Sequence, residues 1–496
     1  MDVVENFIDG KLAHASNDES HSIYNPATGE VIKEVYYANA NEVEAAIQAA
    51  EKAFKTWKNV TPLKRARVLF KFKELLEKHS EELANIITSE HGKVLEDARG
   101  EILRAIELVE YMCGIPNLLK GNYSQNVGTG IDCYTIRQPL GVCVGITPFN
   151  YPVMISCWMF VSAIACGNTF VLKPSEKDPS APILLAQLMQ KAGLPNGVFN
   201  VVNGDKRVVE QLITHNEVKA VSCVGSSTVS EIVYKTAIEH GKRAHTFGSG
   251  KNHCVVMPNC EIDEAVKAVM GAAYGSAGER CMAVSVAVAV GDETADLMIK
   301  KIQEKIPNLK VGSGKESGMD MGPLISKEHW ERVKSYIDLG VNEGAKLIID
   351  GRDAKTHGQK QGFFMGPSLF DKVQPNMRIY QEEIFGPVLE IVRVKNLDEA
   401  IDLINQHTFG NGTAIFTNSG EAARRFADEV QVGMVGINVP TPVPVAYHAF
   451  GGWKRSLFGD IQMHGPESIM FYTKSKSITT HWPREAQDTK YHMPSQ

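Results

Sequence analysis

One of the nine cysteines in this sequence has surroundings suited to a nucleophile. Cys281 lies in the stretch 275–282, which reads Gly-Ser-Ala-Gly-Glu-Arg-Cys-Met. The small residues let backbone and ligand come close together, and the permanent charge of Arg280 would favour the thiolate, which attacks carbonyl carbon. Five other cysteines lie among apolar residues and are interpreted as buried small hydrophobes: Cys143, Cys157, Cys166, Cys223 and Cys254. The stretch therefore indicates covalent chemistry on a carbonyl compound at Cys281.

Two further motifs could bind a nucleotide. Lys173 follows an apolar run, and Glu176 comes three residues later. This pair could bond the diol of a ribose, while the carboxylate would repel a 2′-phosphate, so the pair favours NAD over NADP. Gly225 and Ser226 follow another apolar run and open a helical pattern, where free backbone N–H groups can receive a pyrophosphate. The usual GxGxxG spacing is missing, so this second motif is weak by itself.

The elements that must position these motifs alternate along the chain. Strand-like apolar runs occupy about 142–146, 169–172, 198–202 and 220–224, and helical patterns occupy about 153–166, 181–192, 207–214 and 229–239. This alternation predicts a parallel, Rossmann-like sheet whose ligand binds beyond the carboxyl ends of its strands.

Helical patterns also flank this region on both sides. Short strands and turns come first, followed by a helix through Ala53 with Asn41 as its N-cap and by helical patterns at about 62–78, 80–91 and 94–112. After residue 250, a helix at 262–274, an apolar run at 283–290 and a helix at 293–306 predict a second α/β portion.

The composition limits the possible partners and compartments. The chain has 496 residues, of which 43% are hydrophobic, enough for a large core and at least two domains. A net charge of -6 and scattered Lys and Arg give no footprint for nucleic acid or an anionic membrane. The cysteines form no CxxC pair, and the first residues resemble neither a signal nor a transit peptide. We therefore expect a cytoplasmic protein with free thiols.

One segment, 138–172, contains no charged side chain and is longer than the roughly 20 residues that span a bilayer. Pro148, Asn150 and Pro152 interrupt it, and it divides into a strand, a turn, a helix and a second strand. We interpret it as the buried centre of an α/β domain.

Six short motifs occur in order along the chain. They are Pro-Phe-Asn-Tyr-Pro at 148–152, Lys-Pro-Ser-Glu at 173–176, Gly-Ser-Ser at 225–227, Gly-Glu-Arg-Cys at 278–281, Glu-Glu-Ile-Phe-Gly-Pro-Val at 382–388 and Phe-Gly-Gly-Trp-Lys at 450–454. Each is modest alone, but in this order they resemble the aldehyde dehydrogenase superfamily over nearly the whole chain. The resemblance implies an NAD-binding domain at 1–118 and 139–249, a catalytic domain at 250–455, a β oligomerisation element at 119–138 and 456–485, and a tail at 486–496. It also implies a homo-oligomer, a dimer of dimers.

The resemblance further implies roles for individual residues. Cys281 would be the nucleophile, and the Asn150 amide with the Cys281 backbone N–H would form an oxyanion hole, since an alkoxide needs preplaced donors. The residues that would hold NAD are Thr147, Phe149, Lys173, Glu176, Gly225, Ser226, Glu383 and Phe385. The nicotinamide would accept a hydride as the alkoxide collapses. No metal is expected.

One position departs from the superfamily pattern. Hydrolytic members carry a Glu in a Glu-Leu-Gly-Gly-Lys motif, and this Glu deprotonates the water that cleaves the thioester. The corresponding stretch, 246–253, reads Thr-Phe-Gly-Ser-Gly-Lys-Asn-His, contains no carboxylate and has Phe247 at the Glu position. Without that base water attack should be slow, so the thiol of coenzyme A becomes the more plausible acceptor.

Other residues resemble one branch of the superfamily, the CoA-acylating methylmalonate-semialdehyde dehydrogenases. They lie at 250–253, 276–282 and 433–444. This resemblance implies that Arg104 and Arg280 bind a substrate carboxylate, for which the arginine fork is suited. By composition alone, Arg104 could instead lie on a solvated helix face. The implied reaction converts malonate or methylmalonate semialdehyde, with NAD and CoA, to acetyl-CoA or propionyl-CoA.

Two alternatives stay open at this point. One is a hydrolytic aldehyde dehydrogenase whose base comes from Glu382 or a water relay. The other is a non-catalytic binding or structural relative, against which the presence of Cys281, Asn150 and Glu383 argues.

Overall fold

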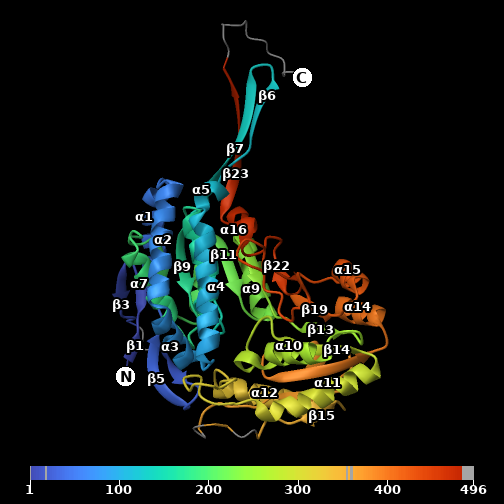
Figure 1. The fold of residues 1–496 in the computed structure, drawn as a ribbon. Helices are drawn as coiled ribbons and strands as arrows, with labels where there is room; N and C mark the ends of the chain where they lie inside the picture. The colour runs from blue at the N-terminus through green and yellow to red at the C-terminus, as the bar shows by residue number, and fades with distance from the viewer. Residues whose placement is uncertain (1, 17–18, 354–355, 358–360, 483–496) are drawn as a thin grey trace.

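The computed structural model describes residues 2–16, 19–353, 356–357 and 361–482. Two large sheets with helices on their faces form the body, and a long three-stranded sheet projects from it (Figure 1). Apart from strands at their edges, both large sheets are parallel. The predicted α/β class with a Rossmann-like sheet is therefore confirmed.

The first large sheet has eight strands. In spatial order they are β22 (Leu457–Phe458), β12 (Arg243–Phe247), β11 (Val218–Val224), β8 (Val142–Ile146), β9 (Thr169–Lys173), β10 (Phe199–Val201), β2 (Asn6–Ile8) and β3 (Lys11–Ala13). The five central strands are parallel, and the strands at the edges run antiparallel to their neighbours. The four strand-like runs predicted from the sequence are β8, β9, β10 and β11.

Helices cover both faces of this sheet. One face carries α6 (Met154–Ala165), with α2 (Pro62–Lys78), α4 (Leu95–Cys113) and α7 (Ser180–Lys191) in the same core, and α3 (Ser80–His91) packs against α4 and α7. The other face carries α1 (Ala40–Trp57), α8 (Lys206–Thr214) and α9 (Ser227–Glu239). Every residue of α6 is buried. The charge-free segment is therefore core, as predicted.

Local capping explains where the first helices begin. Thr61 caps α2, which starts with a proline, and α2 and α3 have the predicted bounds. The predicted Asn41 cap is wrong. Asn39 caps α1, because its side chain accepts hydrogen bonds from the backbone N–H groups of Asn41 and Glu42, and the Glu42 carboxylate accepts one from the Asn39 N–H. This capping box begins the helix earlier than predicted.

The second large sheet has seven strands and its own core. In spatial order they are β15 (Lys346–Ile349), β16 (Ser368–Asp371), β17 (Val388–Val394), β14 (Val284–Val290), β13 (Asn252–Val256), β19 (Gly412–Phe416) and β20 (Met434–Ile437). Its helices are α10 (Ile262–Tyr274), α11 (Asp292–Lys305), α12 (Lys327–Asn342), α14 (Leu397–Gln406) and α15 (Gly420–Glu429). The predicted helix at 262–274 is α10, and the predicted second α/β portion is confirmed.

Smaller elements complete the described chain. They are the sheet β1 (Asp2–Val4), β5 (Glu30–Tyr36) and β4 (Ser20–Asn25), the pair β18 (Phe409–Gly410) and β21 (Trp453–Lys454), the helices α5 (Ile115–Leu118), α13 (Arg378–Gln381) and α16 (Gly465–Phe471), and the 3-10 turns η1 (Gly275–Gly278) and η2 (Ile306–Asn308). No helix in the part of the chain that the structure describes is long and apolar enough to cross a bilayer.

The projecting sheet consists of β6 (Tyr123–Gly128), β7 (Ile131–Pro139) and β23 (Thr473–His481) (Figure 1). It contains strands from both segments that the family resemblance predicts to form an oligomerisation element, although β22, from the second segment, pairs with β12 of the first large sheet. The domain boundaries stay predictions, and the predicted tail at 486–496 lies outside the described residues.

Candidate active site

The chain turns sharply just before Cys281. In the turn η1, Ser276 and Ala277 have positive φ angles of 51° and 52°. Gly278 also has a positive φ, and a Cβ atom built on it would lie 2.2 Å from the backbone oxygen of Gly386. Only glycine fits at this position, and strained backbone of this kind is concentrated at functional sites. We call residues 275–282 the Cys281 loop. The close approach of Gly278 to Gly386 places this loop against the loop that carries Glu383 and Phe385.

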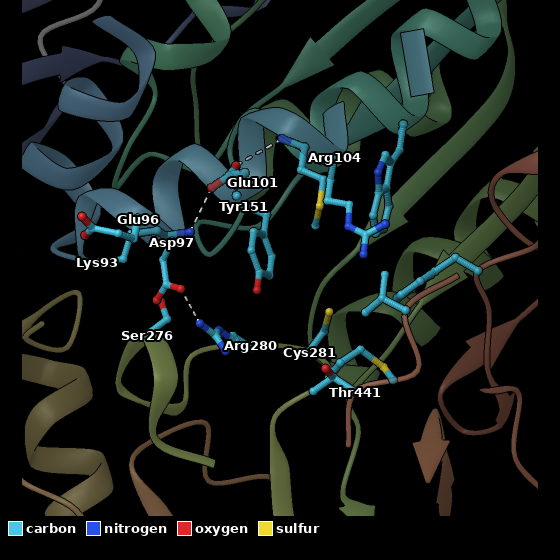
Figure 2. Close-up of a pocket in the computed structure, with 16 residues that line it drawn as sticks. Lys93, Glu96, Asp97, Glu101, Arg104, Tyr151, Ser276, Arg280, Cys281 and Thr441 are labelled. Carbon is cyan, nitrogen blue, oxygen red and sulfur yellow. Dashed lines mark hydrogen bonds and ion pairs between the residues drawn. The ribbon is translucent and has the colours of Figure 1, made fainter. Parts of the chain in front are cut away.

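A cavity of about 220 Å³ opens at Cys281, and we call it the Cys281 cavity. One wall comes from α4 and α6, and the other comes from the Cys281 loop and the segment around Thr441 and Val443. Figure 2 shows the Cys281 sulfur and the side chains of Arg104, Tyr151 and Arg280 around this space. The cavity thus brings Arg104, from a distant part of the sequence, to the predicted nucleophile Cys281 and its neighbour Arg280.

The Cys281 thiol is protonated in the resting protein. Burial, together with the nearby Glu383 carboxylate, raises the pKa of Cys281 to about 12. Backbone N–H groups and Arg280 lower the pKa but are outweighed. The Arg280 charge therefore acts in the predicted direction without producing a resting thiolate, and the predicted nucleophilic role requires the thiol to lose its proton during the reaction.

We expect Glu383→Gln to make the Cys281 thiol more acidic in the cofactor-free protein. Removing the carboxylate removes the charge that opposes the thiolate, so the pKa falls and alkylation by iodoacetamide at pH 8 accelerates by roughly two- to tenfold. The measurement is the alkylation rate against pH. Glu382→Gln serves as a matched control, because the adjacent Glu382 does not act on Cys281. Equal rates for wild type and Glu383→Gln would show that burial alone sets the pKa.

Asn150 is held beside the Cys281 loop at both its ends. Its side-chain Nδ2 donates to the backbone oxygen of Glu279 at 3.2 Å, and its own backbone oxygen accepts a 2.5 Å hydrogen bond from Lys93 Nζ. Lys93 is buried and also pairs with the buried Glu101 at 2.9 Å. The amide is thus positioned before any substrate arrives, which is what an oxyanion donor requires. The oxyanion role itself stays a prediction.

Both predicted carboxylate-binding arginines line the Cys281 cavity. Nη2 of Arg280 lies 2.5 Å from Oδ1 of Asp97, and Nη1 of Arg104 lies 2.9 Å from Oε2 of Glu107. The Arg104 side chain is 41% exposed, and its exposed part faces the cavity as well as solvent (Figure 2). A guanidinium has five N–H donors, so one carboxylate partner leaves donors for a second anion. The pair can therefore receive a small carboxylate near Cys281.

The predicted adenosine-side residues gather at strand ends of the first sheet. Nζ of Lys173 lies 3.3 Å from Oε2 of Glu176. Burial raises the pKa of the Glu176 carboxyl, but Lys173 and other groups outweigh it, so the pKa is lowered overall and the carboxylate is ionised. Ser226 caps α9 just after Gly225 by accepting from the backbone N–H of Val229. A ribose diol and a pyrophosphate suit these groups.

The predicted nicotinamide-side residues lie against the Cys281 loop. The rings of Phe149 and Phe385 meet edge to face, with centroids 5.9 Å apart, and Phe385 has a positive φ of 60°. Oε1 of Glu383 accepts a hydrogen bond from the Gly250 backbone N–H at 2.9 Å. Cys281, Glu383 and Phe385 line one small cavity. The Thr147 hydroxyl is buried with no hydrogen-bond partner in the described part of the chain. These residues fit NAD.

Phe247, at the position of the missing base, ends β12 and is buried against His245 and Phe450. Two carboxylates that line the Cys281 cavity are engaged by other groups. Asp97 pairs with Arg280, and the Glu101 oxygens accept from Lys93 and from the backbone N–H groups of 153 and 154.

Glu382, the alternative base for a hydrolytic enzyme, is also engaged by other side chains. The Glu382 carboxylate is held by the Tyr336 hydroxyl at 2.5 Å and by Arg378 at 2.9 Å, and Glu382 does not line the Cys281 cavity. Its pKa is lowered, first by the Arg378 hydrogen bond, so it is a weak base. Direct activation of water by Glu382 is therefore disfavoured.

Sequence reasoning missed several residues that shape this site. Lys93 and Glu101 fix the Asn150 loop, Asp97 orients Arg280, and Trp158 and Tyr151 line the cavity. Asp97 and Glu101 are four residues apart on α4, and Lys93 is four residues before Asp97, just ahead of the helix. This spacing places side chains on one face of a helix, so it is a signal in the sequence that the three lie together. Their partners lie on distant segments, however, and nothing local in the sequence identifies them.

Comparisons with known proteins agree over the full chain. Residues 13–478 match the model of the aldehyde dehydrogenase family. The malonate-semialdehyde dehydrogenase of Pseudomonas aeruginosa is 54% identical over 486 residues, which are 98% of each chain. A crystal structure of a putative methylmalonate-semialdehyde dehydrogenase from Sinorhizobium meliloti, complexed with NAD, is 51% identical with a TM-score of 0.96, over 98% of this chain and 99% of that one. The methylmalonate-semialdehyde dehydrogenase of Oceanimonas doudoroffii is 55% identical, with the same TM-score and coverage.

Proposed function

Because this chain belongs to the aldehyde dehydrogenase family, we propose that it is an NAD-dependent, CoA-acylating dehydrogenase of malonate or methylmalonate semialdehyde. The observation that carries the proposal is the Cys281 cavity, in which two arginines face the nucleophile while position 247 holds a buried phenylalanine. The names and NAD complex of the relatives support the same conclusion.

The first step is addition of the Cys281 sulfur to the aldehyde carbon. The C–S bond forms, the thiol loses its proton, and the carbonyl oxygen becomes an alkoxide. The Asn150 amide and the Cys281 backbone N–H stabilise this oxygen, because donors fixed in advance lower the barrier by roughly 3–4 kcal/mol each in the best cases. Arg104 and Arg280 hold the distant carboxylate and so orient the aldehyde.

Oxidation leaves an acyl thioester on Cys281. NAD, when bound, supplies the hydride acceptor, and Lys173, Glu176, Ser226, Glu383 and Phe385 would hold it. The β-carboxylate can then leave as CO2, because the thioester carbonyl accepts the electron pair of the broken C–C bond. The carbon that loses CO2 must gain a proton. Thiol attack by CoA finally frees Cys281 and releases acetyl-CoA or propionyl-CoA.

Dependence on CoA tests this function. Wild-type protein mixed with NAD and malonate semialdehyde is expected to form at most about one NADH per active site in a fast phase and then to turn over slowly. Added CoA should restore steady turnover, with acetyl-CoA as the product. Steady NADH formation without CoA would instead identify a hydrolytic aldehyde dehydrogenase, and no NADH with any aldehyde would identify a non-catalytic relative.

Assembly and location are part of the same proposal. The strands β6, β7 and β23 project from the body, and β6 exposes the large apolar side chains of Tyr123 and Val127, which suits a sheet that joins subunits as a dimer of dimers. All nine cysteines are free, which suits the cytoplasm. Size-exclusion chromatography with light scattering would measure the subunit count.

A further inference from the structure

We propose that the Tyr151 hydroxyl is the acid that protonates the carbon from which CO2 has departed. The inference rests on the proposed function, because only a substrate that loses a carboxylate needs this proton. It adds a catalytic residue to the reaction and explains a polar group in the Cys281 cavity that neither binding nor oxidation requires.

Tyr151 is placed among the groups that act on the substrate. It follows Asn150 directly, and its side chain lines the Cys281 cavity together with Arg104, Arg280 and Cys281. In Figure 2 its hydroxyl points into the space between Arg280 and the Cys281 sulfur. A substrate bonded to Cys281 at its carbonyl carbon, with its carboxylate on the arginines, presents its α-carbon between these two anchors. The hydroxyl faces that region.

The hydroxyl is also available. It makes no hydrogen bond to any residue that the structure describes, whereas the charged groups Lys93, Glu101 and Asp97 and the two arginines are engaged. Lys93 Nζ lies 4.4 Å from the centre of the Tyr151 ring, but it donates to Glu101 and to the Asn150 backbone. The Ser276 hydroxyl also has no hydrogen-bond partner among the described residues, but it is buried and so is a poorer candidate than Tyr151, whose hydroxyl points into the cavity. The two arginines hold their protons too tightly to act as acids.

The electrostatic surroundings keep this phenol protonated until it is needed. Burial raises the pKa of Tyr151, and although Arg280 lowers it, Cys281 and Asp97 raise it further. The phenol can still give up its proton, because the enolate carbon is a much stronger base than a phenolate. Arg280 and Lys93 lie close enough to stabilise the phenolate that forms.

The C–C bond to the carboxylate breaks, CO2 leaves, and the electron pair moves into the thioester to give an enolate. The enolate α-carbon then takes the proton of the Tyr151 O–H, which leaves an acetyl or propionyl thioester on Cys281 and a phenolate on Tyr151. The phenolate regains a proton from water through the open side of the cavity. No oxidant or reductant is consumed.

Tyr151→Phe tests the step because it removes one oxygen and keeps the ring. In pre-steady-state mixing with NAD, CoA and saturating malonate semialdehyde, the NADH burst should keep its wild-type rate within about threefold, since oxidation precedes loss of CO2. Formation of acetyl-CoA after the burst should slow by roughly a hundredfold or more, the usual size of general acid catalysis. With propanal, which loses no CO2, formation of propionyl-CoA should stay within about threefold of wild type.

Thr441→Val is the matched control, because it removes a different hydroxyl from the same cavity. Its ratio of acetyl-CoA formation to NADH burst should equal that of wild type. Equal losses with propanal and malonate semialdehyde in Tyr151→Phe would reduce Tyr151 to a structural support. If acetyl-CoA formation by Tyr151→Phe is slow only at subsaturating semialdehyde, Tyr151 binds the carboxylate and is not the acid. Unchanged acetyl-CoA formation at every concentration would also exclude the acid role. Failure of wild type to release CO2 would instead overturn the proposed function itself.

Discussion

Cys281→Ala is expected to abolish NADH formation with every aldehyde while leaving NAD binding nearly unchanged. The sulfur forms the bond to substrate carbon, and no other thiol lines the Cys281 cavity among the described residues. The residues predicted to hold NAD lie on other segments, so the dissociation constant measured by calorimetry should move by less than about twofold.

The control for this variant is Cys260→Ala. Cys260 is also partly exposed, but it is outside the cavity. That variant should keep the wild-type rate. Residual turnover by Cys281→Ala above about a thousandth of wild type would transfer the nucleophilic role to another group.

Arg104→Leu is expected to weaken use of the semialdehyde selectively. Removing one of two cations leaves the bound carboxylate short of a charged donor, a loss of about 2–5 kcal/mol for buried pairs. Arg104 is partly exposed, so we expect the lower end, roughly thirtyfold in kcat/KM for malonate semialdehyde. Propanal has no carboxylate and should lose less than about threefold. Arg280→Leu is less clean, because Arg280 also lowers the pKa of Cys281.

Arg99→Leu separates a local effect from a general loss of charge. Arg99 lies on the same helix, α4, but pairs with Glu81 at 2.8 Å and does not line the cavity. It should leave the ratio of the two aldehydes unchanged. Equal losses for both aldehydes in Arg104→Leu would mean that Arg104 supports the helix rather than the substrate.

The parts of this account that could be predicted from sequence depend on local patterns. Pro62 after Thr61 marks the start of α2, and α10 follows from periodicity alone. The Asn41 error is also local, since Asn39 followed by Glu42 forms a readable capping box that a neighbouring asparagine obscured.

What could not be predicted depends on contacts between distant segments. The pairing of Arg280 with Asp97 joins residues 183 positions apart. The pKa of Cys281 depends on burial and on Glu383, neither of which is visible beside Cys281 in the sequence, whereas the adjacent Arg280 contributes least. A sequence shows which groups are neighbours along the chain, and the fold decides which charges dominate.

The central claim is that Cys281 carries a decarboxylated acyl group that waits for a thiol. It is tested most directly by incubating wild-type protein with NAD and malonate semialdehyde without CoA, quenching in acid after the NADH burst, and determining by mass spectrometry the group on the Cys281 peptide. We predict an acetyl group on most active sites, removed within seconds when CoA is added before the quench. A Cys281 peptide that stays unmodified while NADH continues to form would contradict the claim.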